Sequence, residues 1–412
     1  MSPSPDRPGR TPVVGAGIAA GALVAAAVVA LLVMTIVALG LLPGGPGAPD
    51  GPAAAGAAPG SRSPSQGGST ARGGSLPPAP DVDPAEAFLA DYVNPDGRVV
   101  RRDQGGDTVS EGQAYGLLLA TAAGEELTVR QIWSWTQDNL LGDSGMMAWR
   151  WADGEVVDPN PATDADLDAA WALVVAGEQF DDPALVADGT ALAEAVLTES
   201  TRTTDDGLAL LAGPWVGGSP WLVNPSYSSP SAAALLRDRT GDARWEQVLA
   251  GDRALLARLL EQAPLPPDWA QVDPAGAVAI MPPPGGGEVT FGLDAARVPV
   301  RLAGSCDPAD QAMAASLSDT LGARSPAPGL RDLGGTATVE WSHPLAEVSA
   351  AAAAAAAGDP RAAAGRLDLA ARLQAAEPTY YGAAWLALGE LLLAETGTPF
   401  RPCAPLIEEE DR

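Results

Sequence analysis

Residues Asp107–Ala120 read Asp-Thr-Val-Ser-Glu-Gly-Gln-Ala-Tyr-Gly-Leu-Leu-Leu-Ala. Ser110 followed by Gln113 has the form of a capping box, and the apolar run from Ala114 predicts a buried helix. Glu111 then lies in the first turn of this helix, where free backbone N–H groups and the helix dipole stabilise an anion. Because acidic residues are common at helix starts, the rest of the chain must decide whether Glu111 has a chemical role.

Apolar periodicity and helix-start signals predict twelve helices between residues 85 and 396. Only residues 272–280 and 334–341 have the composition expected of strands. Helices that follow one another in this way predict an all-α fold, with six inner and six outer helices arranged in a ring. The expected helices are 85–92, 110–123, 128–140, 164–179, 183–199, 228–239, 242–262, 294–304, 308–321, 344–357, 360–376 and 380–396.

Three acidic residues fall at the starts of even-numbered helices in this order. Glu111 begins the second helix, Asp164 follows the expected N-cap Thr163 of the fourth, and Asp294 begins the eighth. If every second helix is an inner one, all inner helices run in the same direction. The sequence therefore predicts that Glu111, Asp164 and Asp294 meet at one end of the ring.

The charge of the chain limits its partners and its chemistry. There are 52 acidic residues against 24 basic ones, and the formal net charge of -28 argues against nucleic acid as a partner. His343 is the only histidine, which excludes a site with several histidine ligands for a metal. We therefore expect no metal or organic cofactor, and acid–base chemistry should depend on carboxylates.

The N-terminal part has the composition of a membrane anchor followed by a tether. Residues 13–42 form an uncharged, mainly apolar run that is longer than the roughly 20 residues of a membrane span. Arginines in residues 1–12 place this end in the cytoplasm, so the rest of the chain would lie outside it, at the cell membrane. Residues 43–84, rich in Gly, Pro, Ala and Ser, predict a flexible linker. The alternative is a long cleaved signal, which would make the protein secreted.

The folded domain is expected over residues 85–403, and residues 404–412 should form a solvated acidic tail. Cys306 and Cys403 are the only cysteines. In a domain outside the cytoplasm they would form a disulfide that ties the C-terminal end to the body, and two free buried thiols are the alternative.

Four segments, in their order and spacing, resemble glycoside hydrolase family 8. They are Ser110–Gly116, Ala162–Ala170, Asn224–Tyr227 and Asp294–Pro299. The resemblance implies an (α/α)6 barrel and an inverting, endo-acting enzyme on β-1,4-linked glycans. The chain differs from the usual pattern at Ala169 and at residues 291–293, which concerns the detail of sugar binding.

Carried over by position, the resemblance assigns a role to each acidic residue. Glu111 would be the general acid, Asp294 the general base, and Asp164 the residue that holds the sugar beside the scissile bond. Arg297 matches the motif arginine and would orient Asp294 or a sugar hydroxyl. Aromatic faces stack on sugars, so we expect four cleft residues from their predicted place at the rim: Trp149, Trp151, Tyr227 and Tyr381.

The expected protein is thus a membrane-anchored monomeric glycosidase that cuts internal β-1,4 bonds of a cellulose-like glucan. Xylan and chitosan are alternative substrates, and the negative charge favours cationic chitosan. A polysaccharide-binding domain without activity is the alternative from another class of protein, although Glu111, Asp164 and Asp294 are all present.

Overall fold

The computed structural model describes residues 76–394, 398 and 400–407. The predicted cytoplasmic segment 1–12, the anchor 13–42 and most of the linker 43–84 lie outside these residues. None of the described helices has both the length and the hydropathy that a membrane span requires.

The helices of the described part follow the predicted order closely. They are α2 (Pro84–Tyr92), α3 (Ser110–Ala122), α4 (Glu126–Asn139), α5 (Thr163–Gln179), α6 (Pro183–Glu199), α7 (Pro230–Thr240), α8 (Arg244–Gln262), α9 (Arg297–Gly304), α10 (Pro308–Ala315), α11 (Ser318–Gly322), α12 (Pro344–Ala356), α13 (Pro360–Ala376) and α14 (Tyr380–Leu393). The helix predicted over 308–321 is divided into α10 and α11. The helix predicted from Asp294 begins only at Arg297.

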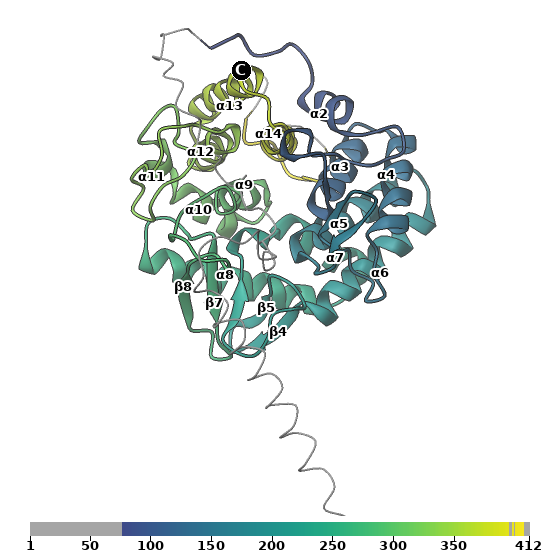
Figure 1. Ribbon diagram of the computed structural model, residues 1–412. Coiled ribbons are helices and arrows are strands. Elements are labelled where there is room, and N and C mark those ends of the chain that lie inside the picture. The colour runs from purple at the N-terminus through teal and green to yellow at the C-terminus, as the bar shows by residue number, and fades with distance from the viewer. Residues whose placement is uncertain (1–75, 395–397, 399, 408–412) are drawn as a thin grey trace, which may run out of the picture. The chain divides into compact units, whose positions relative to one another are not determined.

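These helices form the predicted ring. Helices α3, α5, α7, α9, α12 and α14 contact one another in turn, and α14 closes the ring on α3 (Figure 1). Burial separates the inner from the outer helices. In α3, 12 of 13 residues are buried, whereas in the outer helix α13 only 3 of 17 are. This confirms the all-α (α/α)6 barrel and the assignment of even-numbered helices to its inside.

Short antiparallel strands connect the helices, and there are more of them than the sequence predicted. One sheet contains β1 (Thr108–Val109), β2 (Arg150–Ala152) and β3 (Glu155–Asp158). A second contains β4 (Thr201–Thr204) and β5 (Gly207–Leu210), and a third β6 (Trp221–Val223), β7 (Trp269–Val272) and β8 (Val278–Met281). The candidate 272–280 is therefore the turn between β7 and β8, with strand residues at both of its ends.

The candidate strand 334–341 is absent. Residues in and around this segment make only isolated bridges, between Arg331 and Ala337 and between Pro328 and Ser342. Gly335 has φ of 92°, a left-handed conformation that glycine adopts readily and that interrupts an extended strand.

The disulfide between Cys306 and Cys403 confirms that prediction and ties the C-terminal segment to the barrel. Phe400 in this segment packs edge-on against Trp171 of α5, with 5.1 Å between ring centroids. Within the predicted tail 404–412, Ala404 is exposed, whereas Ile407 is fully buried and its N–H donates to the Leu393 carbonyl. The acidic residues 408–411 lie outside the described part.

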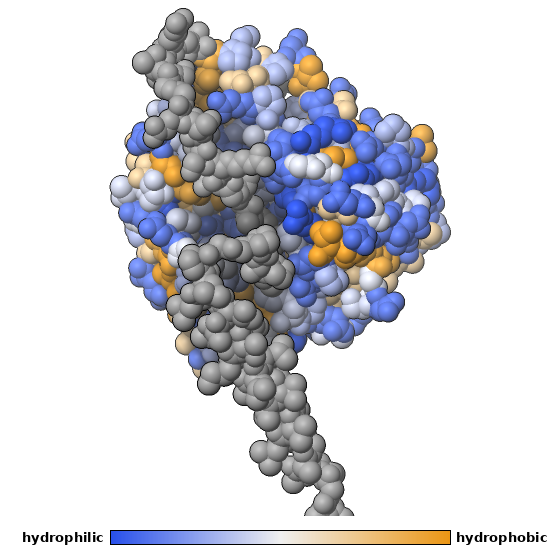
Figure 2. All heavy atoms as spheres, viewed as in Figure 1, coloured by the Kyte–Doolittle hydropathy of each residue, from blue (hydrophilic) through white to orange (hydrophobic). Residues whose placement is uncertain are grey.

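The visible surface is mainly hydrophilic, and its hydrophobic residues occur in separate small patches (Figure 2). Among the described large apolar side chains, Leu127 and Trp341 are well exposed, and Trp341 borders the pocket described below.

Candidate active site

Helix α3 presents Glu111 at the open end of the barrel, but not through the predicted capping box. Val109 is the N-cap residue, and the Ser110 hydroxyl has no partner among the described residues. The Gln113 side chain instead accepts from the Val99 N–H at 2.6 Å and donates to the Thr136 hydroxyl at 2.8 Å. The capping box fails because the buried glutamine satisfies backbone and side-chain groups of neighbouring segments.

The start of α5 departs from its prediction in the same way. Ala162 is the N-cap residue, and Thr163 is the first residue of the helix. No side chain caps this helix start with a hydrogen bond. The link to α3 runs through Trp149, whose carbonyl accepts from the Ser110 N–H at 3.0 Å and whose N–H donates to the Asn160 carbonyl at 3.1 Å. The segment around Trp149 thus joins the starts of the two helices that carry Glu111 and Asp164.

A single arginine binds all three predicted acids. The Nη1 of Arg297 lies 2.6 Å from Glu111 Oε1 and 2.8 Å from Asp164 Oδ2, and its Nη2 lies 3.2 Å from Asp294 Oδ1. The Tyr115 hydroxyl donates to Glu111 Oε1 at 2.6 Å. The structure therefore brings together Glu111, Asp164 and Asp294, as the order of the helices predicted, and places Arg297 among them.

Polar groups from the Asn224 segment complete the environment of Asp294. The Asn224 side-chain amide donates to Asp294 Oδ2 at 3.0 Å. The Ser226 hydroxyl donates to Asn224 Oδ1 at 2.7 Å and accepts from Arg297 Nη2 at 2.6 Å. Both carboxylate oxygens of Asp294 thus have a fixed partner, which restricts the direction of its side chain.

Burial favours the protonated forms of Asp164, Asp294 and Tyr115. Burial is the largest cause that raises the pKa of Asp164 to about 6, although the Arg297 charge opposes it. Burial also raises the pKa of Asp294 well above its usual range, again against the effect of Arg297 and with the effect of nearby carboxylates. The pKa of Tyr115 is raised well above 10 by burial and by Glu111, so its hydroxyl stays protonated and donates.

A second buried ion pair lies one helical turn further along α5 and α9. Arg301, one turn after Arg297, binds Asp168 through two hydrogen bonds of 2.9 and 2.6 Å. The Arg301 guanidinium also lies 5.5 Å from the ring centroid of Trp385, whose indole N–H donates to the Tyr115 hydroxyl at 3.1 Å. The spacing of four between Asp164 and Asp168, and between Arg297 and Arg301, could have indicated this pair from the sequence.

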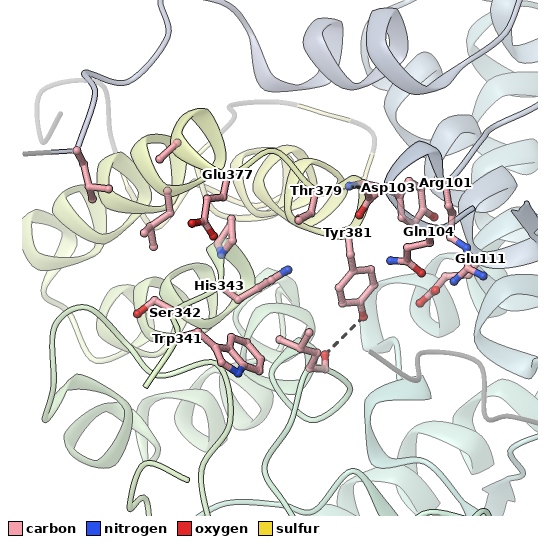
Figure 3. Close-up of a pocket in the computed structure, with 16 residues that line it drawn as sticks. Arg101, Asp103, Gln104, Glu111, Trp341, Ser342, His343, Glu377, Thr379 and Tyr381 are labelled. Carbon is pink, nitrogen blue, oxygen red and sulfur yellow. Dashed lines mark hydrogen bonds between the residues drawn. The ribbon is translucent and has the colours of Figure 1, made fainter. Parts of the chain in front are cut away.

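A pocket of about 600 Å³ opens beside the cluster (Figure 3). It is lined by residues near Glu111, by the starts of α12 and α14 and by the end of α13. In Figure 3, Tyr381 lies between Glu111 and Trp341, and its hydroxyl donates to the Leu293 carbonyl at 3.5 Å. Glu111 and Asp294 each keep 5% of their surface exposed, whereas Asp164 keeps 1%.

The predicted aromatic residues have different surroundings. Tyr381 lines the pocket, and buried Tyr227 packs against Arg297, with 5.5 Å from the guanidinium carbon to the ring centroid. Trp149 and Trp151 do not line the pocket. Trp149 is buried beside Val109 and Ala162. Trp151 packs between Trp135 and the Arg98 guanidinium.

Trp341 and His343, just before α12, also line the pocket. Trp341 is 45% exposed, whereas Trp149, Tyr227 and Tyr381 are buried and Trp151 is half-buried. His343 is the N-cap of α12, and its Nδ1 accepts from the Leu345 N–H at 3.2 Å. Burial lowers the pKa of His343 to about 4, so it is neutral at ordinary pH.

Comparison with known proteins agrees with the fold. The model of the family described as Glycosyl hydrolases family 8 matches residues 82–394. A probable endoglucanase of Novacetimonas hansenii is 36% identical over 233 residues, which cover 54% of this chain and 67% of that protein. An endoglucanase of Escherichia coli strain K12 is 34% identical over 202 residues, 46% of this chain and 54% of that protein. The chain thus matches between half and two thirds of the length of these relatives.

Solved structures match over a larger part. The endo-beta-1,4-glucanase CMCax of Acetobacter xylinum superposes with a TM-score of 0.62 and 28% identity, covering 75% of this chain and 97% of that one. The match includes the barrel, and the family model spans the segments that carry Glu111, Asp164 and Asp294. From the family match, the shared fold and the convergent carboxylates, we conclude that the chain belongs to glycosyl hydrolases family 8.

Proposed function

We propose that the protein is an inverting endo-β-1,4-glucanase that cleaves internal bonds of a cellulose-like glucan. The observation that carries the proposal is the contact of one arginine, Arg297, with three carboxylates from separate inner helix starts at the edge of a pocket. The similar proteins named as endoglucanases support the choice of substrate.

In the proposed reaction Glu111 gives a proton to the glycosidic oxygen as the bond to the anomeric carbon breaks. Asp294 takes a proton from a water molecule, whose oxygen attacks that carbon from the opposite face. Such a single displacement inverts the anomeric configuration and needs two carboxyl groups and water. Asp164 would bind the sugar beside the scissile bond and help to distort its ring.

The pocket supports the binding of a glycan chain. Tyr381 and Trp341 border it, and an exposed indole such as that of Trp341 is suited to stack on the apolar face of a pyranose. Arg297 is proposed to act beneath the sugar by holding the carboxylates, and Tyr227 by packing against the Arg297 guanidinium. Trp149 is proposed to act through the backbone that joins the starts of α3 and α5, and Trp151 to contact sugars at the rim of the cleft.

The proposal predicts that Glu111→Gln loses activity by at least about a thousandfold, since glutamine cannot give up a proton to the leaving oxygen. The measurement is viscosity loss and reducing-end release from soluble β-1,4-glucan by the full chain purified in detergent. Glu126→Gln is the matched control, because Glu126 is an exposed glutamate in the first turn of the neighbouring helix α4. Equal activity of the two variants would refute the general-acid role of Glu111.

The same assay tests the alternatives when xylan and chitosan are included. Cleavage of chitosan alone would fit the net charge of -28, because a negatively charged protein attracts a cationic polymer. Binding to a glycan without any cleavage would identify a polysaccharide-binding domain. A single active substrate that Glu111→Gln no longer cleaves would identify both the polymer and the acid.

We also propose that residues 13–42 anchor the protein in the cell membrane with its barrel outside the cytoplasm, as a monomer. The apolar composition of that segment and the disulfide Cys306–Cys403, a bond typical of oxidising compartments, support this. Reporter fusions after residues 12 and 84 test the topology. Release of the whole protein into the medium would favour a cleaved signal.

A further inference from the structure

Asp268 holds the backbone on both sides of Asp294. It lies in the loop between α8 and β7, and its Oδ1 accepts from the Gly292 N–H at 3.0 Å and from the Ala295 N–H at 2.8 Å. Its Oδ2 accepts from the Thr290 hydroxyl at 2.9 Å. Three hydrogen bonds accepted by one carboxylate therefore fix the turn that presents Asp294 just before α9.

The contact depends on a glycine. A Cβ atom built on Gly292 would lie 2.4 Å from Asp268 Oδ2, so any larger residue would displace this carboxylate. The close approach allows the carboxylate to reach backbone N–H groups on both sides of Asp294.

The sheet that positions Asp268 also positions the side-chain partner of Asp294. Strands β6 and β7 pair in antiparallel register, with Val223 opposite Ala270. Asn224 directly follows β6, and Asp268 directly precedes β7, so both emerge at the same end of this strand pair. One sheet thus holds the Asp294 side chain through Asn224 and its backbone through Asp268.

We propose that Asp268 is a positioning residue for Asp294, which fixes the attacking geometry of the general base and acts on it through its negative charge. The inference rests on the proposed function, in which Asp294 is the base. A carboxylate misplaced by about 1 Å can lower the rate of an enzyme by about a hundredfold.

The charges around Asp294 give the sign of the electrostatic effect. Arg297 lowers the pKa of Asp294, whereas burial and the carboxylates of Asp268, Glu111 and Asp164 raise it. Removing the charge of Asp268 therefore lowers the pKa of Asp294. Because a general base acts when it is deprotonated, the variant should stay active to lower pH than the wild type.

The experiment uses the full chain in detergent and follows kcat, KM and the pH profile of kcat/KM on soluble β-1,4-glucan. Asp268→Ala removes three hydrogen bonds, and kcat should fall by about a hundredfold with KM changed less than twofold. Asp268→Asn keeps the shape of the side chain without the charge. Its kcat should fall by about tenfold or less, and its acidic limb should move down by about one pH unit.

Two further variants keep the test informative if Asp268→Ala fails to fold. Gly292→Ala pushes the carboxylate away and should lower kcat as Asp268→Ala does. Thr290→Val removes one hydrogen bond but leaves the charge, so its acidic limb should stay in place. Asp273→Asn is the matched control, because Asp273 accepts a backbone N–H in the β7–β8 turn and should behave as wild type.

The outcome for Asp294→Asn separates the two proposals. If that variant is inactive while Asp268→Asn and Asp268→Ala keep the wild-type kcat and acidic limb, the positioning role of Asp268 is wrong and the base remains. Loss of activity that follows only a lower Tm, with an unmoved acidic limb, would also refute it in favour of a structural role. Full activity of Asp294→Asn would refute the base itself.

Discussion

Arg297 is buried completely, and its guanidinium is the shared partner of three carboxylates and of the Ser226 and Tyr115 hydroxyls. A guanidinium presents several donors in one plane, whereas an ammonium is a single charged point on a flexible stem. Removing a partner from a buried ion pair leaves an uncompensated charge, which is strongly destabilising. The position should therefore distinguish arginine from lysine.

We expect Arg297→Lys to fold but to lose at least about a hundredfold in kcat, because lysine keeps the charge but cannot reach Glu111, Asp164 and Asp294 together. Steady-state kinetics with circular dichroism as the check of folding measure this. Arg239→Lys, at an exposed ion pair with Glu178, is the control. Wild-type kcat in Arg297→Lys would show that the positive charge alone is sufficient.

At the scale of single residues, the sequence predicted which acids meet but not how they are held. Glu111, Asp164 and Asp294 were predicted to meet because they start even-numbered helices, which are the inner ones and run parallel. The capping roles of Ser110 and Thr163 were wrong. Gln113, the expected partner of Ser110 in the capping box, instead binds Val99 and Thr136 in other segments.

Among the elements, α9 shows what a local signal can add. Its predicted start at Asp294 was three residues early. Pro299 has no N–H to donate to the carbonyl of residue 295, and the Ala295 N–H is bound by Asp268. The helix consequently starts at Arg297, with Pro299 in its first turn. The proline was visible in the sequence, whereas the distant aspartate was not.

The C-terminal segment gives a prediction at the same scale. The disulfide closes a loop with a sequence separation of 97 residues, and it holds Phe400 on Trp171. Cys403→Ser should lower the free energy of unfolding by about 2–4 kcal/mol. Thermal melting with and without reductant measures this, and Cys306→Ser should melt at the same temperature as Cys403→Ser. A Tm of the wild type that does not change on reduction would contradict the prediction.

For the whole molecule, a buried acid outside the active site makes stability depend on pH. Burial, and then the charge of Asp310, raises the pKa of Asp252 in α8 to about 7. The unfolded chain releases this proton near pH 4, so the folded state binds more protons between about pH 4 and 7. Stability from this group therefore falls as the pH rises through that range.

Asp252→Asn should remove this loss. Its free energy of unfolding should exceed that of the wild type by on the order of 2 kcal/mol at pH 8, with a smaller difference near pH 4. Melting temperatures over pH 4–8 test it, with Asp238→Asn as an exposed control. A difference between Asp252→Asn and wild type that does not change with pH would show that Asp252 does not titrate in this range.

The closure of the ring between α14 and α3 also sets an order in time. Trp385, in the last helix of the barrel, donates to the hydroxyl of Tyr115, which in turn donates to Glu111, across a sequence separation of 270 residues. During synthesis, the support of Glu111 is therefore complete only after α14 has left the ribosome. We therefore expect no activity before α14 is in place. A fragment that ends before α14 contains every proposed catalytic carboxylate but lacks Trp385, which supports Glu111 through Tyr115.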